Sequence, residues 1–110
     1  MQEDVLMPRK QADQFDKVRR KVKKAEIEGL VKDLVRIPSH HEVPTREKEI
    51  AEFLNEFLVS EGVESRLRAV EKNRPNVIAI VKGQGDRKSL MMNGHTDTIP
   101  AYSAGYGAVG

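Results

Sequence analysis

Apolar residues recur at helical spacing between residues 13 and 36, but they form two stripes rather than one. The first stripe consists of Phe15, Val18, Val22 and Ala25. The second stripe consists of Ile27, Leu30, Val31, Leu34 and Val35. At about 100° per residue the two stripes face nearly opposite sides, which a single straight helix on one core does not allow. We therefore expect a core helix from about Ala25, and over residues 11–24 an extension that packs elsewhere.

A second helix is predicted over residues 45–61. Pro38 ends the preceding helix because the residue before a proline avoids the α region, and Thr45 can cap the new helix through its hydroxyl. Gly62 suits the left-handed position just past a helix end. The apolar face of this helix consists of Ile50, Ala51, Phe53, Leu54, Phe57 and Leu58. Its polar side consists of Glu47, Lys48, Glu52, Asn55 and Glu56. This division predicts a packing helix without chemistry of its own.

Three strands are predicted after this helix. Residues 63–70 alternate loosely, as an exposed or edge strand does. A continuous apolar run indicates that residues 76–82 form a strand buried on both faces. Residues 89–93 are expected to form the next strand, antiparallel to 76–82 across the polar turn 83–88. The fold class is therefore α/β, with two or three helices on a small mixed sheet.

The length and composition describe one small domain or part of a larger one. Of the 110 residues, 38% are hydrophobic and 33% are charged, and Cys and Trp are absent. The lack of cysteine excludes disulfide scaffolds and thiolate metal sites, and it fits a reducing cytoplasm, where we expect the protein. No apolar run approaches the roughly 18 residues of a membrane span, and the start does not resemble a signal peptide. We expect no membrane partner.

The net charge of +2 is unevenly distributed, because residues 1–24 hold eight Lys or Arg against four Asp or Glu. The basic cluster at residues 19–24 could contact nucleic acid. Aromatic residues are not interleaved with it, however, and no DNA-binding motif is recognisable. We interpret residues 1–24 as a charged N-terminal extension with a solvated helix face, and expect no nucleic-acid partner.

The residues best suited to chemistry come after the last predicted strand, where Gly94 leads into His95 and Asp97. In α/β enzymes the carboxyl end of a strand is where chemistry is usually placed. His95 is a candidate metal ligand and Asp97 its candidate partner, because a ligating imidazole usually donates its second N–H to a carboxylate or carbonyl. Taken alone, such a pair is more often an ordinary loop or a satisfied hydrogen bond, since zinc requires about three or four protein ligands.

A second candidate metal site comprises His40, His41 and Glu42. Neighbouring residues in an extended segment point to opposite faces, so both imidazoles rarely serve one ion. We favour an ordinary loop here. The glycines of residues 83–88 precede no predicted helix, so a phosphate-binding loop is equally disfavoured.

Four segments together resemble one known family, and they occur in the family's order and spacing over about residues 25–100. They are LVKDLVRIPS at 30–39, EIAEFL at 49–54 with the helix after it, RPNVIA at 74–79 and MNGHTDTIP at 92–100. The family is that of the dinuclear zinc aminoacylases and deacylases, which includes acetylornithine deacetylase, succinyl-diaminopimelate desuccinylase, glutamate carboxypeptidase and related dipeptidases. The last segment is similar to the family signature NGHTDTVP, with Ile99 in place of valine.

The resemblance implies a fold, a reaction and two site residues. Residues 25–110 would be the N-terminal portion of a three-layer zinc-hydrolase catalytic domain. His95 would ligate one of two Zn²⁺ ions, and Asp97 would be the catalytic residue that holds its imidazole. The family reaction is hydrolysis of the amide bond of N-acyl amino acids or small peptides, with a metal-bridging water as nucleophile and a glutamate as general base. Zinc suits this reaction because it acidifies bound water and polarises the carbonyl.

The chain departs from the family after Pro100. In the family the bridging aspartate, the general-base glutamate, further acidic ligands and a second histidine all lie downstream, and residues 101–110 lack the expected continuation. We therefore expect a fragment that neither binds zinc at family strength nor turns over substrate as the isolated chain. The alternative is a non-catalytic, stand-alone interaction module that binds through an uncovered sheet edge or the basic start. The substrate, the acyl group and the oligomeric state stay open.

Overall fold

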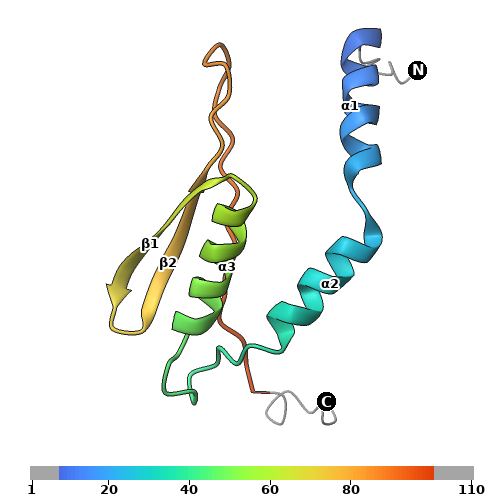
Figure 1. Ribbon diagram of the computed structural model, residues 1–110. Coiled ribbons are helices and arrows are strands. Elements are labelled where there is room, and N and C mark those ends of the chain that lie inside the picture. Colours follow the sequence, from blue (N-terminus) through green and yellow to red (C-terminus); the bar gives the residue numbers. More distant parts are fainter. Residues whose placement is uncertain (1–7, 101–110) are drawn as a thin grey trace, which may run out of the picture. The chain divides into compact units, whose positions relative to one another are not determined.

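The computed structural model describes residues 8–100, which form a small mixed α/β fold (Figure 1). The elements in this range are the helices α1 (Arg9–Lys21), α2 (Lys24–Val35) and α3 (Lys48–Ser60) and the strands β1 (Glu64–Glu71) and β2 (Arg74–Ile80). The chain divides into two compact units, Met1–Leu34 and Val35–Gly110.

The first unit contains two helices that are separated where the apolar face changes, but the helix expected to join a core from about Ala25 is not buried. Val22 is extended, with φ −79° and ψ 117°, and its N–H donates to the carbonyl of Arg19 at 3.2 Å. The α2 helix then begins at Lys24, beside the predicted start near Ala25. Neither helix has a buried residue. No helix within residues 8–100 is long and apolar enough to cross a membrane.

The second unit is organised by α3, whose C-terminal end is formed as predicted. Gly62 has φ +79°, a conformation that glycine adopts without steric cost. Its N–H donates to the carbonyl of Val59 at 3.0 Å, and the N–H of Val63 donates to that of Leu58 at 2.9 Å. These two bonds are the pair that closes a Schellman motif, and they turn the chain directly into β1.

The N-terminal end of α3 differs from the prediction, because the helix starts at Lys48 rather than near Thr45. The Thr45 hydroxyl lies 3.4 Å from a carboxylate oxygen of Glu49 and caps no backbone N–H. The residue at the cap is Glu47, which was predicted on the wet side of the helix but is 8% exposed. Its carboxylate turns to Arg74 instead, so a long-range ion pair takes the place of a local cap.

β1 and β2 form an antiparallel hairpin, and one face of it packs on α3 (Figure 1). Leu67 is paired with Val77, so both point to the same face. Ser65, on that face too, donates its hydroxyl to the amide oxygen of Asn55 in α3 at 2.7 Å. The predicted apolar face of α3 is confirmed, since Ile50 and Ala51 are buried and its other members are half-buried.

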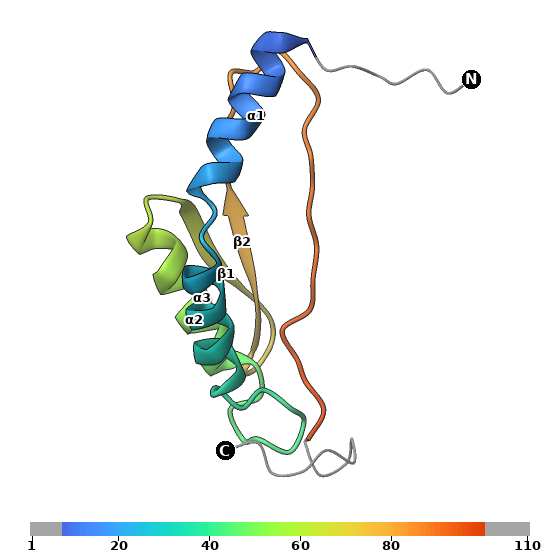
Figure 2. The same ribbon diagram turned by 90° about the vertical axis from the view of Figure 1, so that its right-hand side faces the viewer.

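Two strand predictions are wrong. Residues 89–93 form no strand, so the described sheet is a two-stranded antiparallel hairpin rather than a mixed sheet. The strand β2 is not buried on both faces, because Arg74, Asn76, Ala79 and Ile80 are exposed. Residues 82–98 follow it as a long segment without helix or strand (Figure 2). Leu90, Met91 and Met92 are 84%, 88% and 87% exposed. Their apolar character favours a buried strand, but a strand needs a hydrogen-bonded neighbour, and the described residues supply none here.

Candidate functional site

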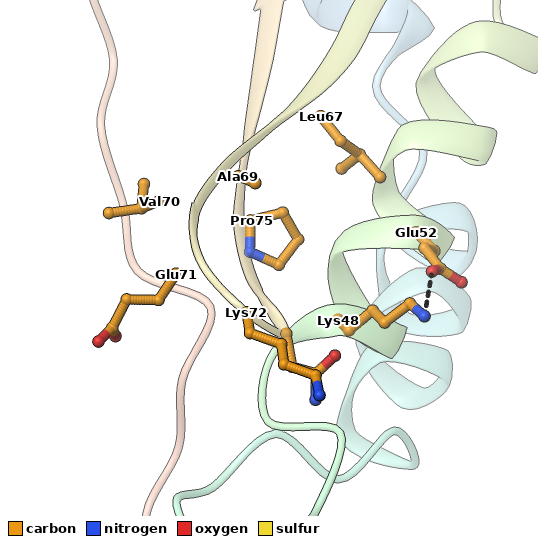
Figure 3. Close-up of a pocket in the computed structure, with 9 residues that line it drawn as sticks. Lys48, Glu52, Leu67, Ala69, Val70, Glu71, Lys72 and Pro75 are labelled. Carbon is orange, nitrogen blue, oxygen red and sulfur yellow. Dashed lines mark ion pairs between the residues drawn. The ribbon is translucent and has the colours of Figure 1, made fainter.

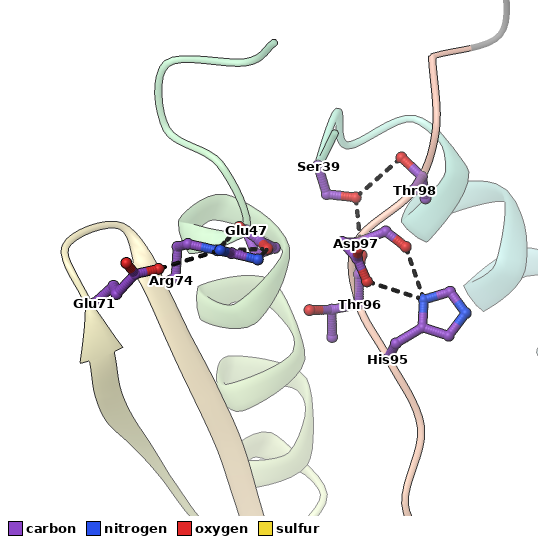
Figure 4. Close-up of polar contacts among 8 residues, drawn as sticks. All are labelled: Ser39, Glu47, Glu71, Arg74, His95, Thr96, Asp97 and Thr98. Carbon is purple, nitrogen blue, oxygen red and sulfur yellow. Dashed lines mark hydrogen bonds and ion pairs between the residues drawn. The ribbon is translucent and has the colours of Figure 1, made fainter. Parts of the chain in front are cut away.

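The candidate site is the loop formed by residues 95–98, which we call the 95–98 loop. It is attached to the rest of the second unit through Ser39, the last residue of the IPS turn. Ser39 is completely buried, and its hydroxyl donates to the backbone oxygen of Thr96 at 2.9 Å (Figure 4). The same hydroxyl lies 3.4 Å from that of Thr98. Two of the segments that carry the family resemblance, 57 residues apart, are therefore in direct contact.

Within this loop His95 and Asp97 are brought together as predicted. The Nδ1 atom of His95 lies 2.8 Å from the backbone oxygen of Asp97 and 3.2 Å from its carboxylate Oδ1 (Figure 4). A carbonyl oxygen can only accept, so Nδ1 carries the proton and donates it. The opposite ring nitrogen, Nε2, then keeps its lone pair in the neutral imidazole.

This arrangement suits one corner of a zinc site. A neutral imidazole with a free Nε2 and an Nδ1–H bound to a carboxylate is the usual form of a zinc-ligating histidine. The side chains of His95 and Asp97 are 83% and 58% exposed, so the ligand atom is open to solvent. Across residues 8–100, however, no three His, Asp or Glu side chains gather closely enough to hold a metal ion together. The described residues therefore fit zinc with one ligand and its partner.

The adjacent histidines His40 and His41 stand apart from this arrangement. Their ring centroids are 6.4 Å apart and their planes are 76° from parallel, so the two rings meet edge to face. The Nδ1 of His40 accepts the backbone N–H of Glu42 at 3.3 Å, and the Nε2 of His41 lies 3.9 Å from the Glu42 carboxylate. These are local loop contacts, in agreement with the interpretation favoured from the sequence.

An ion-pair network holds the start of α3 to the start of β2. The guanidinium of Arg74 donates to both carboxylate oxygens of Glu47 at 2.9–3.3 Å, and a third N–H donates to Glu71 at 3.1 Å (Figure 4). The hydrogen bond and charge of Glu47, followed by those of Glu71, raise the pKa of Arg74. This network fixes the RPN segment against α3, which positions the hairpin.

One hollow lined by described residues lies away from the 95–98 loop. It is an open groove of about 550 Å³ between α3 and the hairpin turn, with Leu67 and Pro75 in its floor and the Lys48–Glu52 ion pair on its rim (Figure 3). None of its lining residues belongs to the 95–98 loop or to the IPS turn. The groove therefore adds nothing to the candidate site.

Two contributions to the site were missed in the sequence. Ser39 was noted only as part of the family resemblance, and Glu47 was assigned to solvent. The signal for Ser39 was a small polar residue directly after Ile37 and Pro38, where a turn must satisfy its polar groups in a buried setting. The signal for Glu47 was Arg74, an arginine at the entry of an otherwise apolar strand, which requires a partner when it is partly covered.

Replacing Ser39 with alanine is expected to lower the free energy of unfolding by about 1–3 kcal/mol, because the carbonyl of Thr96 loses its buried donor. The 95–98 loop should then exchange its amide hydrogens faster, while the Schellman turn at Gly62 should keep its protection. Hydrogen exchange measured by NMR checks both regions. Unchanged exchange at residues 95–98 would show that Ser39 does not hold the loop.

Comparison with family models, with curated proteins and with solved structures finds no match to this chain.

Proposed function

We propose that this chain is the N-terminal part of the catalytic domain of a zinc-dependent amidohydrolase of the cytoplasm. Its reaction would be hydrolysis of the amide bond of N-acyl amino acids or small peptides. The observation that carries the proposal is the His95–Asp97 pair, in which Nδ1 of the imidazole is hydrogen-bonded and Nε2 is free to ligate. The four segments that resemble the zinc aminoacylase and deacylase family support the same conclusion.

Each described residue has a definite part in this proposal. His95 supplies one zinc ligand through Nε2. Asp97 fixes the tautomer and the orientation of the ring, and its negative charge makes the imidazole a stronger ligand. Ser39 holds the backbone between these two residues at 2.9 Å, so the ligand is presented from a fixed loop. When bound, zinc supplies an acidified water and polarises the amide carbonyl.

The isolated chain is proposed to be inactive. Within residues 8–100 the site has one ligand and its partner, whereas hydrolysis by this chemistry also needs further ligands and a general base. The 110-residue chain should therefore release no amino acid from N-acetyl or N-succinyl amino acids in the presence of zinc.

A second candidate function is a non-catalytic interaction module. The observation that favours it is the segment 89–93, in which Leu90, Met91 and Met92 are more than four-fifths exposed. Contiguous exposed apolar residues of this kind mark surfaces that another polypeptide covers. In the hydrolase proposal the same surface is covered by further parts of the catalytic domain.

The experiment that separates the two functions uses a protein translated from the coding DNA past the Gly110 codon, prepared beside the 110-residue chain. Under the hydrolase proposal, the longer protein hydrolyses an N-acyl amino acid in a zinc-dependent manner, and His95→Ala lowers its kcat/KM by at least about a hundredfold. The matched control is His41→Ala, which should retain activity. A zinc-loaded longer protein without hydrolysis, or one in which both variants behave alike, would refute the proposal.

A further inference from the structure

Helix α1 carries a surface that the proposed hydrolase site does not use. Phe15 and Val18 are each about 60% exposed, and at 100° per residue they lie about 60° apart on one side of the helix. We call these two residues the α1 stripe; Val22, equally exposed, follows the helix as its extended C-terminal cap. Six Lys or Arg occupy the same helix with only two Asp, so α1 is a basic amphipathic helix.

The charges of α1 are arranged around the stripe in a specific way. Arg19 borders the stripe on one side and Lys21 on the other, while Asp13 lies on the opposite side of the helix. The second acid, Asp16, is paired with Arg19 at 3.3 Å. A surface that approaches the stripe therefore meets basic side chains on both flanks and no unpaired carboxylate.

The helix also lacks packing of its own, since none of its 13 residues is buried. An unsupported helix of about 12–15 residues is marginal in water. Whatever binds the stripe must supply the missing stabilisation, so binding and helix formation in α1 should be coupled. Helicity is therefore a direct readout of occupancy.

We propose that α1 binds an anionic membrane surface, lying along it with the α1 stripe at the boundary between headgroups and acyl chains. This is the mode of interfacial helices, which combine a modest apolar face with flanking Lys and Arg. Basic residues near an anionic bilayer each contribute about 1 kcal/mol. The sequence-based expectation of no membrane partner rested on the absence of a spanning segment, and surface binding requires none.

Two other occupants fit the helix less well. A nucleic acid would use the basic residues but would leave the α1 stripe in water, because phosphate binding needs no aliphatic contact. A second copy of the chain would cover the stripe but would bring two strongly basic helices together, which like-charge repulsion opposes. Only a surface that is both anionic and apolar accounts for the stripe and its charged borders.

The test mixes the full 110-residue chain with vesicles of phosphatidylcholine containing about one-third phosphatidylserine, and with vesicles of phosphatidylcholine alone. Co-sedimentation measures binding and far-ultraviolet circular dichroism measures helicity. We expect binding and increased helicity with the anionic vesicles only. Val18→Ser should weaken this binding about three- to tenfold, whereas Val31→Ser, which alters a half-exposed valine of α2, should not.

A matched pair of double variants tests the electrostatic contribution to vesicle binding. The double variant Arg19→Gln and Lys21→Gln should weaken binding to anionic vesicles about twentyfold at low salt. The double variant Lys82→Gln and Lys88→Gln makes the same change in net charge outside α1 and should leave binding nearly unchanged. Equal effects of the two double variants would show that general charge, not α1, attracts the chain to the vesicles.

Three further results would overturn the proposal. One is equal binding to both kinds of vesicle, and another is equal effects of Val18→Ser and Val31→Ser. The third is absence of binding to either kind of vesicle. In that case we would test for salt-dependent binding to random duplex DNA that Val18→Ser leaves intact, and for self-association that Val18→Ser abolishes. Those last outcomes assign α1 to nucleic acid or to a second copy. None of these measurements depends on the hydrolase site, so the two proposals stand or fall separately.

Discussion

Replacing Ile50 with alanine is expected to unfold the unit formed by α3 and the hairpin. Ile50 is 6% exposed and is one of two buried hydrophobic residues found in the described core. Truncation of a buried isoleucine to alanine costs about 2–5 kcal/mol. A core in a domain of this size rarely supplies more than about 3–5 kcal/mol. The single change therefore removes most or all of the available stability.

Urea titration followed by circular dichroism and by the dispersion of amide NMR signals measures this effect. The matched control is Val59→Ala in the same helix, because Val59 is 54% exposed and its truncation should cost less than about 0.5 kcal/mol. If Ile50→Ala keeps the wild-type midpoint, the core of this unit lies elsewhere.

Zinc is expected to bind the 110-residue chain weakly and through His95. Complete structural zinc sites with four ligands are worth about 10–16 kcal/mol, so a single imidazole should contribute about a quarter of that and bind in the millimolar range. Ring signals of His95 in NMR spectra should shift during a zinc titration, and Asp97→Asn should weaken the response about tenfold, since it removes the carboxylate that strengthens the ligand.

The matched control for this titration is His40→Ala. The Nδ1 of His40 already accepts a backbone N–H at 3.3 Å, so its loss should leave the zinc response nearly unchanged. His95→Ala should remove the response. Metal analysis after desalting should find far less than one zinc ion per chain. Two retained zinc ions per purified chain would contradict this prediction and would mean that ligands outside the His95–Asp97 pair hold the metal.

The helices were largely predictable because their signals are local. The switch of apolar face near Ala25 is a property of a few consecutive turns, and the left-handed conformation at Gly62 results from the end of a single helix. The start of α3 was not predictable in this way. Thr45 offers a local cap, but Glu47 is bound by Arg74, 27 residues further along the chain, and the sequence around Thr45 contains no sign of that partner.

The strands were harder to predict than the helices, because their pairing depends on residues elsewhere in the chain. An apolar run such as residues 89–93 indicates that burial would be favourable, but it does not supply the neighbour that a strand needs for its hydrogen bonds. β1 and β2 pair because a short turn at Asn73, with φ 64°, joins them directly. Pairing of residues 89–93 had no such local help, and the described residues leave this segment exposed.

In the candidate site the contact between His95 and Asp97 was predicted, whereas the residue that holds their loop was not. The spacing of His95 and Asp97 was sufficient to predict their hydrogen bond, because side chains two residues apart in a short loop lie within hydrogen-bonding distance in many conformations. The contact of Ser39 with Thr96 joins residues 57 positions apart. A buried hydroxyl can satisfy many different carbonyls, so nothing in the sequence identified which one it would meet.

The exposure of Met91 and Met92 has a chemical consequence. Their thioethers are open to peroxide in the chain as described, and oxidation converts each into a polar, chiral sulfoxide. A segment that carries two sulfoxides loses the apolar character that would allow it to be buried against the hairpin. The oxidation state of these two side chains therefore records whether the segment was covered when the protein was exposed to an oxidant. If the segment was exposed at that time, methionine sulfoxide reductases would be needed to reduce the two side chains again.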